Sequence, residues 1–396
     1  MLDSLINNFY KKYTTISLKF KRYMHTTLDM DDKLIGIIGA RGVGKTTFLL
    51  QYLKELKIPF EKKLYFSADH FLVSNYSLYE IAQEFEKIGG EVLVIDEIHK
   101  YPNFTQELKS IYDSFELKVI FSGSSAISLE NAKYDLSRRA VLYRVQGLSF
   151  REFIEYETNI KFDVISLNDI LNNHIELALD IGTKIKPFEY FKKYLEYGYY
   201  PFYKQNKNLY SSKLNEILNT VIESDLPIVF NIEPNKIFKL KKLLFLLCLS
   251  KPYELNISKL SQKIEINRTT LYNYMAYLEA GNIIKLIKTD EKGNKLLTKP
   301  EKVYLNNTNL NFAYCNNADI GSLRETFFAN QLSLNHNIHY SKIGDFRVDN
   351  KYIVEVGGKN KSFNQIKDIP NSFIVADDIE IGSDAKIPLW LFGFLY

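Results

Sequence analysis

One segment constrains this chain more than any other: residues 33–50, which read KLIGIIGARGVGKTTFLL. The apolar run Leu34–Ile38 predicts a buried strand, and the pattern over Thr47–Leu56 predicts a helix. The octet GARGVGKT between them matches GxxxxGK[ST] in the strand–loop–helix setting that this motif requires. Glycines let the backbone fold around a phosphate, and the helix N-terminus points N–H groups at the anion. The segment therefore predicts a nucleotide-binding P-loop.

The residue types in this loop predict how ATP and Mg²⁺ would be held. Lys45 is expected to reach the β- and γ-phosphates, and Thr46 to offer its hydroxyl to Mg²⁺. The expected nucleotide-binding residues are Gly39, Arg41, Gly42, Val43, Gly44, Lys45, Thr46 and Thr47.

A second apolar run, Val92–Ile95, ends in the carboxylates Asp96 and Glu97. It is typical of a buried parallel strand, and ligands of α/β sheets bind at the carboxyl ends of such strands. Asp96 is predicted to hold the magnesium ion through its water shell, and Glu97 to polarise the attacking water. The second carboxylate favours ATP hydrolysis over phosphoryl transfer to a bound small molecule. The alternative is an acidic pair that caps the next helix.

A third apolar run, Lys118–Phe121, leads into Ser122 and Ser124. A polar side chain at this strand end would lie beside the γ-phosphate. We predict that Ser122 senses the phosphate, with Ser124 as the second choice. A plain turn after the strand is the alternative.

Absent motifs exclude other P-loop classes. The sequence has no NKxD tetrapeptide, which argues against a GTPase, and no LSGGQ signature, which argues against a transporter-type ATPase. Residues 96–99 read DEIH, as in a helicase box. However, no later arginine-rich motif supplies a second helicase lobe.

The amino-acid composition further narrows the class of protein. Hydrophobic residues make up 46% and charged residues 25%, which is ordinary for globular domains, and 396 residues suffice for two or three of them. The net charge of +4 is too small to indicate a nucleic-acid binder by itself, so any basic surface must be local. No apolar stretch is long enough to span a membrane.

The two cysteines and the N-terminus bear on cellular location. Cys248 and Cys315 lie far apart in the sequence and in no CxxC motif, so we predict neither a disulfide framework nor a cysteine zinc site. The basic N-terminus lacks the apolar core of a signal peptide, and we interpret it as a solvated or partner-facing helix. Together these features predict a cytoplasmic protein.

Aromatic residues are abundant, with 28 tyrosines and 27 phenylalanines. The stretch Tyr190–Tyr203 combines tyrosines with lysines and would suit base stacking on a single strand. The same residue types recur throughout the chain, so we favour a general compositional bias.

Further segments complete a recognisable order of motifs. Residues 135–140 read DLSRRA, and residues 147–153 read GLSFREF. With the P-loop and Asp96–His99 before them, the chain resembles prokaryotic AAA-superfamily ATPases that carry a winged helix and a restriction-endonuclease-like domain of unknown function. The resemblance covers essentially the whole chain. It implies that Arg139 acts as an arginine finger or nucleotide sensor. Arg138 replaces a glycine common in relatives, which leaves open which arginine acts.

The resemblance implies an α/β fold with a P-loop NTPase parallel sheet and three further parts. The expected parts are an AAA-type ATPase core over residues 1–155, a helical lid over 156–233, a winged helix over 234–300, and a PD-(D/E)XK nuclease-like α/β domain over 301–396.

The winged helix is also visible in the residue pattern. Helices are expected over Lys236–Ser250, Asn256–Ile264 and Arg268–Ala280, with Gly281 ending the last. A hairpin would follow, with a strand to Ile287, a turn at 291–295, and a return through 296–297. DNA contacts would come from Arg268, Thr269, Thr270 and Asn273, and from wing lysines Lys288, Lys292 and Lys295. Docking to a protein is the alternative.

The C-terminal part carries a carboxylate pattern. Glu325 lies in an expected helix, and Asp345 and Glu355 lie on two expected strands, Gly344–Val348 and Tyr352–Val356, joined by a turn at 349–350. In a PD-(D/E)XK nuclease such carboxylates hold a divalent metal for phosphodiester hydrolysis. The expected ExK lysine is replaced, since residues 355–357 read EVG. Lys359 is the predicted substitute, and a site kept only for binding is the alternative.

These features predict an ATP-driven, nucleic-acid-associated machine or switch, in genome maintenance or defence. ATP, Mg²⁺, double-stranded DNA and a second copy of the chain are its expected partners. The alternative is a nucleotide-dependent signalling or scaffold protein that binds no DNA and carries an inactive nuclease-like domain.

Overall fold

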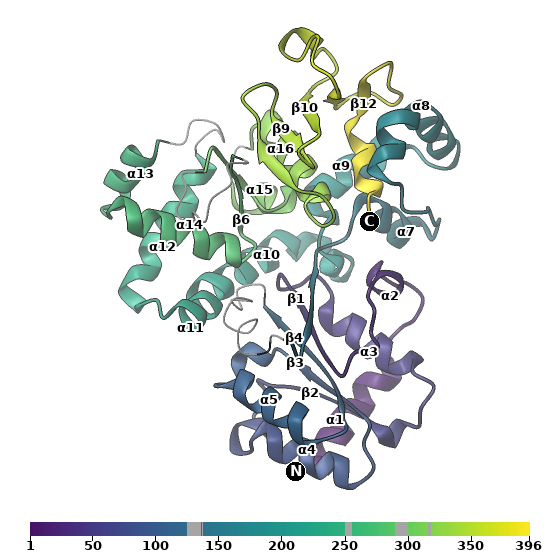
Figure 1. Cartoon of the computed structure of the whole chain (residues 1–396), viewed down its shortest axis with the longest axis vertical. Helices are drawn as coiled ribbons and strands as arrows, with labels where there is room; N and C mark the ends of the chain where they lie inside the picture. The colour runs from purple at the N-terminus through teal and green to yellow at the C-terminus, as the bar shows by residue number, and fades with distance from the viewer. Residues whose placement is uncertain (125–135, 137, 250–255, 290–299, 316–317) are drawn as a thin grey trace. The chain divides into compact units, whose positions relative to one another are not determined.

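A computed structural model of the chain describes residues 1–396 except 125–135, 137, 250–255, 290–299 and 316–317 (Figure 1). The described residues form two compact units, Met1–Gln146 and Gly147–Tyr396. The boundary lies nine residues before the expected end of the ATPase core at 155. Helix α7 (Phe150–Thr158), with its capping box at Ser149 and Glu152, consequently belongs to the second unit.

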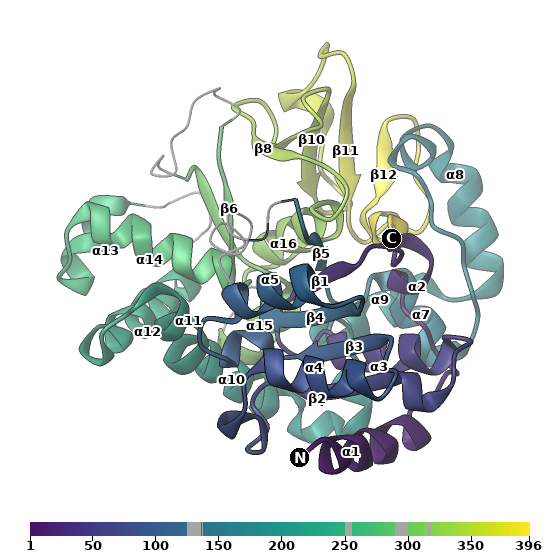
Figure 2. The ribbon, with the colours of Figure 1, turned by 60° about the horizontal axis from the view of Figure 1, so that its bottom comes forward.

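The first unit is built on a five-stranded parallel sheet with the order β2-β3-β4-β1-β5. Figure 2 shows its central strands side by side with helices packed around them. All six residues of β1 and all five of β3 are buried, which explains why these strands read as continuous apolar runs. The strands are β1 (Leu34–Gly39), β2 (Lys63–Ser67), β3 (Val92–Asp96), β4 (Lys118–Ser124) and β5 (Val141–Val145).

The helices of the first unit connect these strands or cover the sheet. The expected helix after the P-loop is present as α3, and it begins at Lys45. The helices are α1 (Leu2–Thr15), α2 (Met24–Thr27), α3 (Lys45–Glu55), α4 (Leu78–Lys87) and α5 (Phe104–Ser114).

The prediction of a solvated N-terminal helix is wrong for one face of α1. Leu5 and Phe9 are buried, and the Phe9 ring stacks on Phe60 with 5.0 Å between the ring centroids. Helix α1 packs along β2 and also contacts α3 and α4. Lys11 and Lys12 are exposed, and the Lys12 ammonium lies over the Tyr65 ring of β2, 4.8 Å from its centroid.

The second unit contains a mixed five-stranded sheet with the order β12-β11-β10-β9-β8. The β10, β11 and β12 strands run parallel, whereas β8 and β9 are antiparallel to their neighbours. Asp349 and Asn350 both have positive φ in the tight turn between β9 and β10, as such hairpins require. The strands are β8 (Ile338–Tyr340), β9 (Phe346–Val348), β10 (Tyr352–Gly357), β11 (Ser372–Ala376) and β12 (Lys386–Pro388).

Helices make up most of the rest of the second unit. The apolar stretch Ile387–Tyr396 near the C-terminus forms the end of β12 and then a buried 3₁₀ segment, Leu389–Phe394. The remaining helices are α8 (Leu167–Lys184), α9 (Pro187–Lys193), α10 (Tyr210–Thr220), α11 (Leu226–Phe230), α12 (Pro234–Cys248), α13 (Ile257–Ile264), α14 (Arg268–Ala280), α15 (Thr308–Tyr314) and α16 (Ile320–Leu332).

The aromatic stretch over residues 190–203 lies in a core. Tyr194, Tyr199, Tyr200 and Tyr203 are each at most 3% exposed, and each ring packs against another buried aromatic ring. These four tyrosines offer no surface on which a base could stack, which agrees with a compositional bias.

Helices α12, α13 and α14 occur where the sequence predicts them, and α14 ends at Ala280 directly before Gly281. The hairpin differs from the expectation. Strand β6 (Ile284–Ile287) pairs antiparallel with β7 (Lys302–Leu305), which lies beyond the expected return strand. The expected turn and return at 291–297 lie outside the described residues. The expected boundary at 300/301 therefore cuts between two paired strands.

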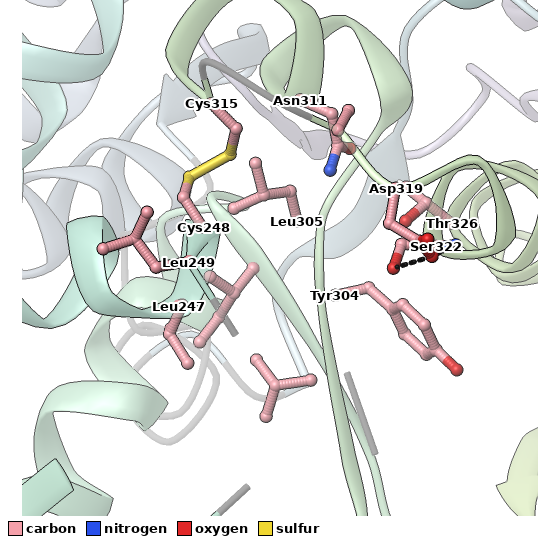
Figure 3. Close-up of a pocket in the computed structure, with 13 residues that line it drawn as sticks. Leu247, Cys248, Leu249, Tyr304, Leu305, Asn311, Cys315, Asp319, Ser322 and Thr326 are labelled. Carbon is pink, nitrogen blue, oxygen red and sulfur yellow. Dashed lines mark hydrogen bonds between the residues drawn. A yellow bond between two sulfur atoms is a disulfide. The ribbon is translucent and has the colours of Figure 1, made fainter. Parts of the chain in front are cut away.

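The prediction about the cysteines is wrong. Cys248, the last residue of α12, and Cys315, directly after α15, form a disulfide that links positions 67 residues apart. Figure 3 shows this bond in the wall of a cavity of about 120 Å³, opposite Asn311 and Thr326. The error arose because sequence distance says nothing about which helix ends meet in space. The cytoplasmic location, which rested partly on unpaired cysteines, stays a prediction.

Among the helices that the structure describes, none combines the length and the apolar character needed to cross a membrane.

Candidate nucleotide-binding site

The P-loop follows β1 and has the backbone that the motif requires. Gly42 and Gly44 have φ values of +86° and +98°, in the left-handed region that favours glycine. A Cβ on Gly39 would lie 2.4 Å from the carbonyl oxygen of Val145 on β5, so only glycine fits there. Gly44 immediately precedes α3, whose N-terminus therefore faces the loop. This arrangement leaves backbone N–H groups for a phosphate.

Lys45 lies inside the loop it was predicted to serve. Its ammonium group donates hydrogen bonds to the carbonyl oxygens of Gly39 at 2.8 Å and Ala40 at 3.0 Å, and the residue is 5% exposed. Burial fixes the stem of the side chain, and these two carbonyl oxygens hold its ammonium group in the loop. A phosphate in the loop would add a charged acceptor for this ammonium group.

Asp96 accepts hydrogen bonds from two neighbouring strands, from the P-loop helix and from the residue that follows it in the chain. Its Oδ2 accepts hydrogen bonds from the Thr46 hydroxyl at 2.6 Å and the Tyr65 hydroxyl at 2.7 Å. Its Oδ1 accepts from the Ser122 hydroxyl and from the Glu97 amide. Burial and the Asp96 charge raise the pKa of Tyr65 far above its ordinary value, so Tyr65 remains a neutral donor. The contacts fix the Asp96 carboxylate beside Thr46, as the predicted metal pair requires.

Thr46 and Asp96 supply the kind of ligand atoms that a magnesium ion prefers. Both supply oxygen ligands, and these converge within hydrogen-bond distance at the carboxyl ends of β1 and β3. Mg²⁺ takes oxygen ligands and in nucleotide sites uses one or two protein oxygens beside the phosphates. Residues Thr46 and Asp96 would thus hold the ion together with ATP.

Glu97 is held between the P-loop and a buried histidine. Its Oε2 lies 3.4 Å from Nε2 of His99 and 3.9 Å from Nη2 of Arg41. The Ser124 backbone amide donates to Nδ1 of His99 at 3.3 Å, which assigns the ring proton to Nε2, where it faces Glu97. His99 thereby links the end of β4 to the predicted water-activating carboxylate. In the sequence, His99 stands out only as the last residue of the DEIH tetrapeptide, and no pattern predicts its contact with Glu97.

Arg22 is a second residue that sequence reasoning missed. The sequence predicts that the basic N-terminal segment is solvated or faces a partner, but Arg22, which belongs to that segment, is only 6% exposed. Its Nη1 donates to the carbonyl oxygens of Val43 at 2.7 Å and Gln146 at 3.0 Å. Arg22 therefore supports the P-loop from outside. No local motif marks such a residue, because its partners lie 21 and 124 residues further along the chain.

The two serines at the carboxyl end of β4 lie at different parts of the site. Ser122 contacts Asp96 and the Glu97 amide, the latter at 3.3 Å. Ser124 contacts His99 through its backbone. A phosphate-sensing role for Ser122 stays a prediction, and its place beside both carboxylate residues is compatible with it.

Arg139 is not brought together with the P-loop residues. It forms a two-pronged ion pair with Asp113, from Nε at 2.9 Å and Nη2 at 3.0 Å, and this pairing raises the pKa of Arg139. Asp113 belongs to the end of α5, which precedes the amino end of β4, whereas the P-loop follows the carboxyl end of β1. Because β1 and β4 are parallel, these are opposite edges of the sheet. An arginine finger at Arg139 would have to act on a second copy of the chain.

The predicted nuclease-like residues are brought together only in part. Glu325 on α16 and Asp345 before β9 share the ammonium of Lys302, at 2.9 Å and 2.7 Å. Glu355 on β10 pairs with Lys361. Lys359 is exposed and has no place in this cluster, which corrects the prediction. The chain turns after Gly357, and the backbone N–H of Lys361 donates a hydrogen bond to the Gly358 carbonyl oxygen at 3.0 Å. This turn returns Lys361, rather than Lys359, to Glu355.

These carboxylates do not fit the metal that the resemblance implies. Among the residues that the structure describes, no three histidine, cysteine, aspartate or glutamate side chains are grouped so as to hold a metal ion. The positions beside Glu325, Asp345 and Glu355 are taken by lysine ammonium groups.

Comparisons with known proteins agree with this geometry. Residues 31–154 match a family described as an AAA domain, and residues 188–319 match a domain of unknown function (DUF8612). The chain therefore contains an AAA-type P-loop domain followed by a domain to which no function is assigned.

Among full-length relatives, an uncharacterized protein of Methanocaldococcus jannaschii is 28% identical over 305 residues. The match covers 74% of this chain and 63% of that protein, so the chain spans less than two thirds of its relative.

Two solved structures are similar to the chain at low TM-scores. The Saccharomyces cerevisiae Hsp104–ADP complex is 19% identical, with 63% of this chain and 37% of that chain covered, at a TM-score of 0.29. AMPPCP-bound DnaA from Aquifex aeolicus is 16% identical, with 68% and 85% covered, at a TM-score of 0.27. At such TM-scores the likeness supports no functional statement.

Proposed function

We propose that the first unit binds ATP with Mg²⁺ and hydrolyses it. The observation that carries this proposal is the convergence of the P-loop, Thr46, Asp96 and Glu97 at the carboxyl edge of the parallel sheet, where β1 and β3 lie on either side of β4. The AAA-domain match over residues 31–154 supports the same chemistry. When bound, Mg²⁺ would neutralise phosphate charge next to Thr46 and Asp96.

Each residue then has a defined part in the reaction. Lys45 leaves the carbonyls of Gly39 and Ala40 and pairs with the phosphates. Glu97 accepts the proton of the attacking water, and His99 keeps its carboxylate in place. General bases of this kind work when they lie within hydrogen-bond reach of the proton that they remove.

The basic experiment is Mg²⁺-dependent phosphate release by the full chain, with ATP affinity measured separately. Lys45→Ala is expected to weaken ATP binding roughly 10- to 100-fold, because a hydrogen bond to a charged group contributes about 1.5–3 kcal/mol. The matched control is Lys57→Ala, an exposed lysine just beyond α3, which should bind ATP normally. Equal ATP affinity in Lys45→Ala and in the unaltered chain would contradict the proposal.

His99 is expected to act as a positioning residue. His99→Ala should lower kcat about tenfold, since an unpositioned general base loses part of its contribution. The KM for ATP and the ATP affinity should not change, because the role proposed for His99 acts through its contacts with Glu97 and the Ser124 amide. A purely structural role would instead lower ATP affinity and kcat together, along with the thermal midpoint.

Duplex DNA is a second candidate ligand, supported by the surface of α14. Arg268 and Thr269 are exposed at its N-terminal end, where a winged helix places base contacts. The wing lysines Lys292 and Lys295 lie outside the described residues. DNA affinity that falls steeply with salt, and ATP hydrolysis that DNA stimulates in the unaltered chain but not in Glu97→Gln, would support a DNA-coupled machine. Slow hydrolysis indifferent to DNA would favour the nucleotide switch.

A further inference from the structure

The carboxylate cluster of the second unit consists of Glu325, Asp345 and Glu355 together with two lysines, Lys302 and Lys361. Glu325, Glu355 and Lys302 are between 3% and 7% exposed. Charges buried to this degree are retained in proteins only when they are paired or when they bind a metal ion. The contacts of each carboxylate therefore decide between these two cases.

Lys302 stands between the first two carboxylates. Its ammonium donates to Oε2 of Glu325 at 2.9 Å and to Oδ1 of Asp345 at 2.7 Å. The other Asp345 oxygen accepts from the Val356 amide at 2.9 Å, and Oε2 of Glu325 also accepts from the Tyr304 hydroxyl. Both oxygens of Asp345 are thus engaged by donors of the same unit.

Lys361 occupies the space left by the altered ExK motif. A Cβ built on Gly357 would lie 2.8 Å from Cγ of Lys361 and 2.9 Å from its Cβ and Cδ. The Lys361 side chain thus fills the volume that a side chain at position 357 would take. Its ammonium pairs with Oε1 of Glu355. The lysine missing from the strand is restored by a residue four positions later.

We propose that Lys302 and Lys361 close this cluster to divalent cations, so that it serves as an ion-pair joint inside the second unit. Magnesium binds oxygen at about 2.0–2.1 Å, so an ion on Oδ1 of Asp345 would lie within roughly 5 Å of the Lys302 ammonium. Two positive charges at that separation in a buried site repel each other strongly. Metal entry therefore requires the lysine to leave its two partners.

The electrostatics of Lys302 support this arrangement. Burial alone would lower the pKa of Lys302, but the charges of Glu325 and Asp345 outweigh burial and raise it. The ammonium therefore stays charged in place. Because β7 pairs with β6, Lys302 ties the β6–β7 hairpin to α16 and to the strands β9 and β10.

The test measures Mn²⁺ binding to the full chain in the absence of nucleotide. Binding is detected as a decrease of the electron paramagnetic resonance signal of free Mn²⁺. All chains carry Asp96→Asn, which removes the carboxylate at the P-loop. The expected result is that this chain and the same chain with Asp345→Asn bind equally little Mn²⁺. A stoichiometric Mn²⁺ site that Asp345→Asn abolishes would overturn the proposal.

The converse experiment removes the two lysine charges from the carboxylate cluster. Lys302→Met with Lys361→Met should create Mn²⁺ binding that is lost when Asp345→Asn is added, because both substitutions remove charge and keep side-chain length. If this double variant does not fold, the single variant Lys361→Met replaces it, since Lys361 is partly exposed. Folded lysine variants without any gain in Mn²⁺ binding would also overturn the proposal. Neither outcome depends on ATP hydrolysis, so the two proposals fail or succeed separately.

Discussion

Glu97→Gln is expected to lower kcat for ATP hydrolysis about 100-fold or more, the range typical for loss of a positioned general base. Glutamine keeps the size of the side chain and can still contact His99 and Arg41, but it cannot accept the proton of the attacking water. Affinity for ATP should remain, because the contacts assigned to the phosphates come from the P-loop. The variant should therefore hold ATP without turning it over.

Phosphate release under single turnover, combined with equilibrium binding of ATP, separates these two properties. Lys45→Ala is the opposite control, because it should lose binding first. A Glu97→Gln chain that hydrolyses ATP at the unaltered rate would place the general base elsewhere. A chain that loses ATP affinity would indicate that Glu97 holds Arg41 and the loop rather than water.

Lys302→Met is expected to destabilise the second unit by about 3–5 kcal/mol, the cost of removing one partner of a buried ion pair. The substitution leaves Glu325 and Asp345 without their shared cation in a site where few water molecules can replace it. Lys359→Met is the matched control, because Lys359 is exposed and belongs to no ion pair that the structure describes. Its effect should stay within about 0.5 kcal/mol.

Trp390 provides a local signal for this measurement. It is the single tryptophan of the chain, it is 1% exposed, and it lies in the second unit. Its fluorescence during urea unfolding therefore reports that unit. Equal urea midpoints of unfolding for Lys302→Met and Lys359→Met would contradict the prediction that the Lys302 ion pairs stabilise the second unit.

The loss should also depend on pH in a defined direction. Burial and the neighbouring Asp345 charge raise the pKa of Glu325, and the same two causes raise the pKa of Glu355. A carboxyl group with a raised folded-state pKa contributes stability that is present below its unfolded value and is lost as pH rises through the folded value. Near pH 4 Glu325 is protonated and carries no charge, so the Lys302 ammonium stabilises it less. The difference between Lys302→Met and the unaltered chain should therefore widen as pH rises from about 4 to 7.

The nucleotide site could be predicted from sequence because its chemistry is local. A P-loop needs a strand, glycines with positive φ and a helix start within a dozen residues, and all three stand in the printed sequence. The acidic pair at the end of β3 and the serines at the end of β4 follow from the same rule, since parallel strands end at a common edge. Arg22 and Tyr65 were missed because their roles depend on partners far along the chain.

The C-terminal part shows the limit of such reasoning. The sequence placed Glu325, Asp345 and Glu355 on the correct helix and near the correct strands, and it identified the missing ExK lysine. It chose Lys359 because that residue is nearest in the chain, whereas a turn returns Lys361 to Glu355. No pattern pointed to Lys302, which reaches the cluster from a strand of a different sheet.

Sequence alone therefore predicted where the residues proposed to bind phosphate, hold metal and activate water lie in the first unit, because each is found at the end of a strand with a strong apolar signal. Tertiary structure decided which charges meet. It joined Cys248 to Cys315, buried Arg22 under the P-loop and paired Arg139 with Asp113. Pairings of this kind depend on distances through space between elements, and residue spacing carries no record of those distances.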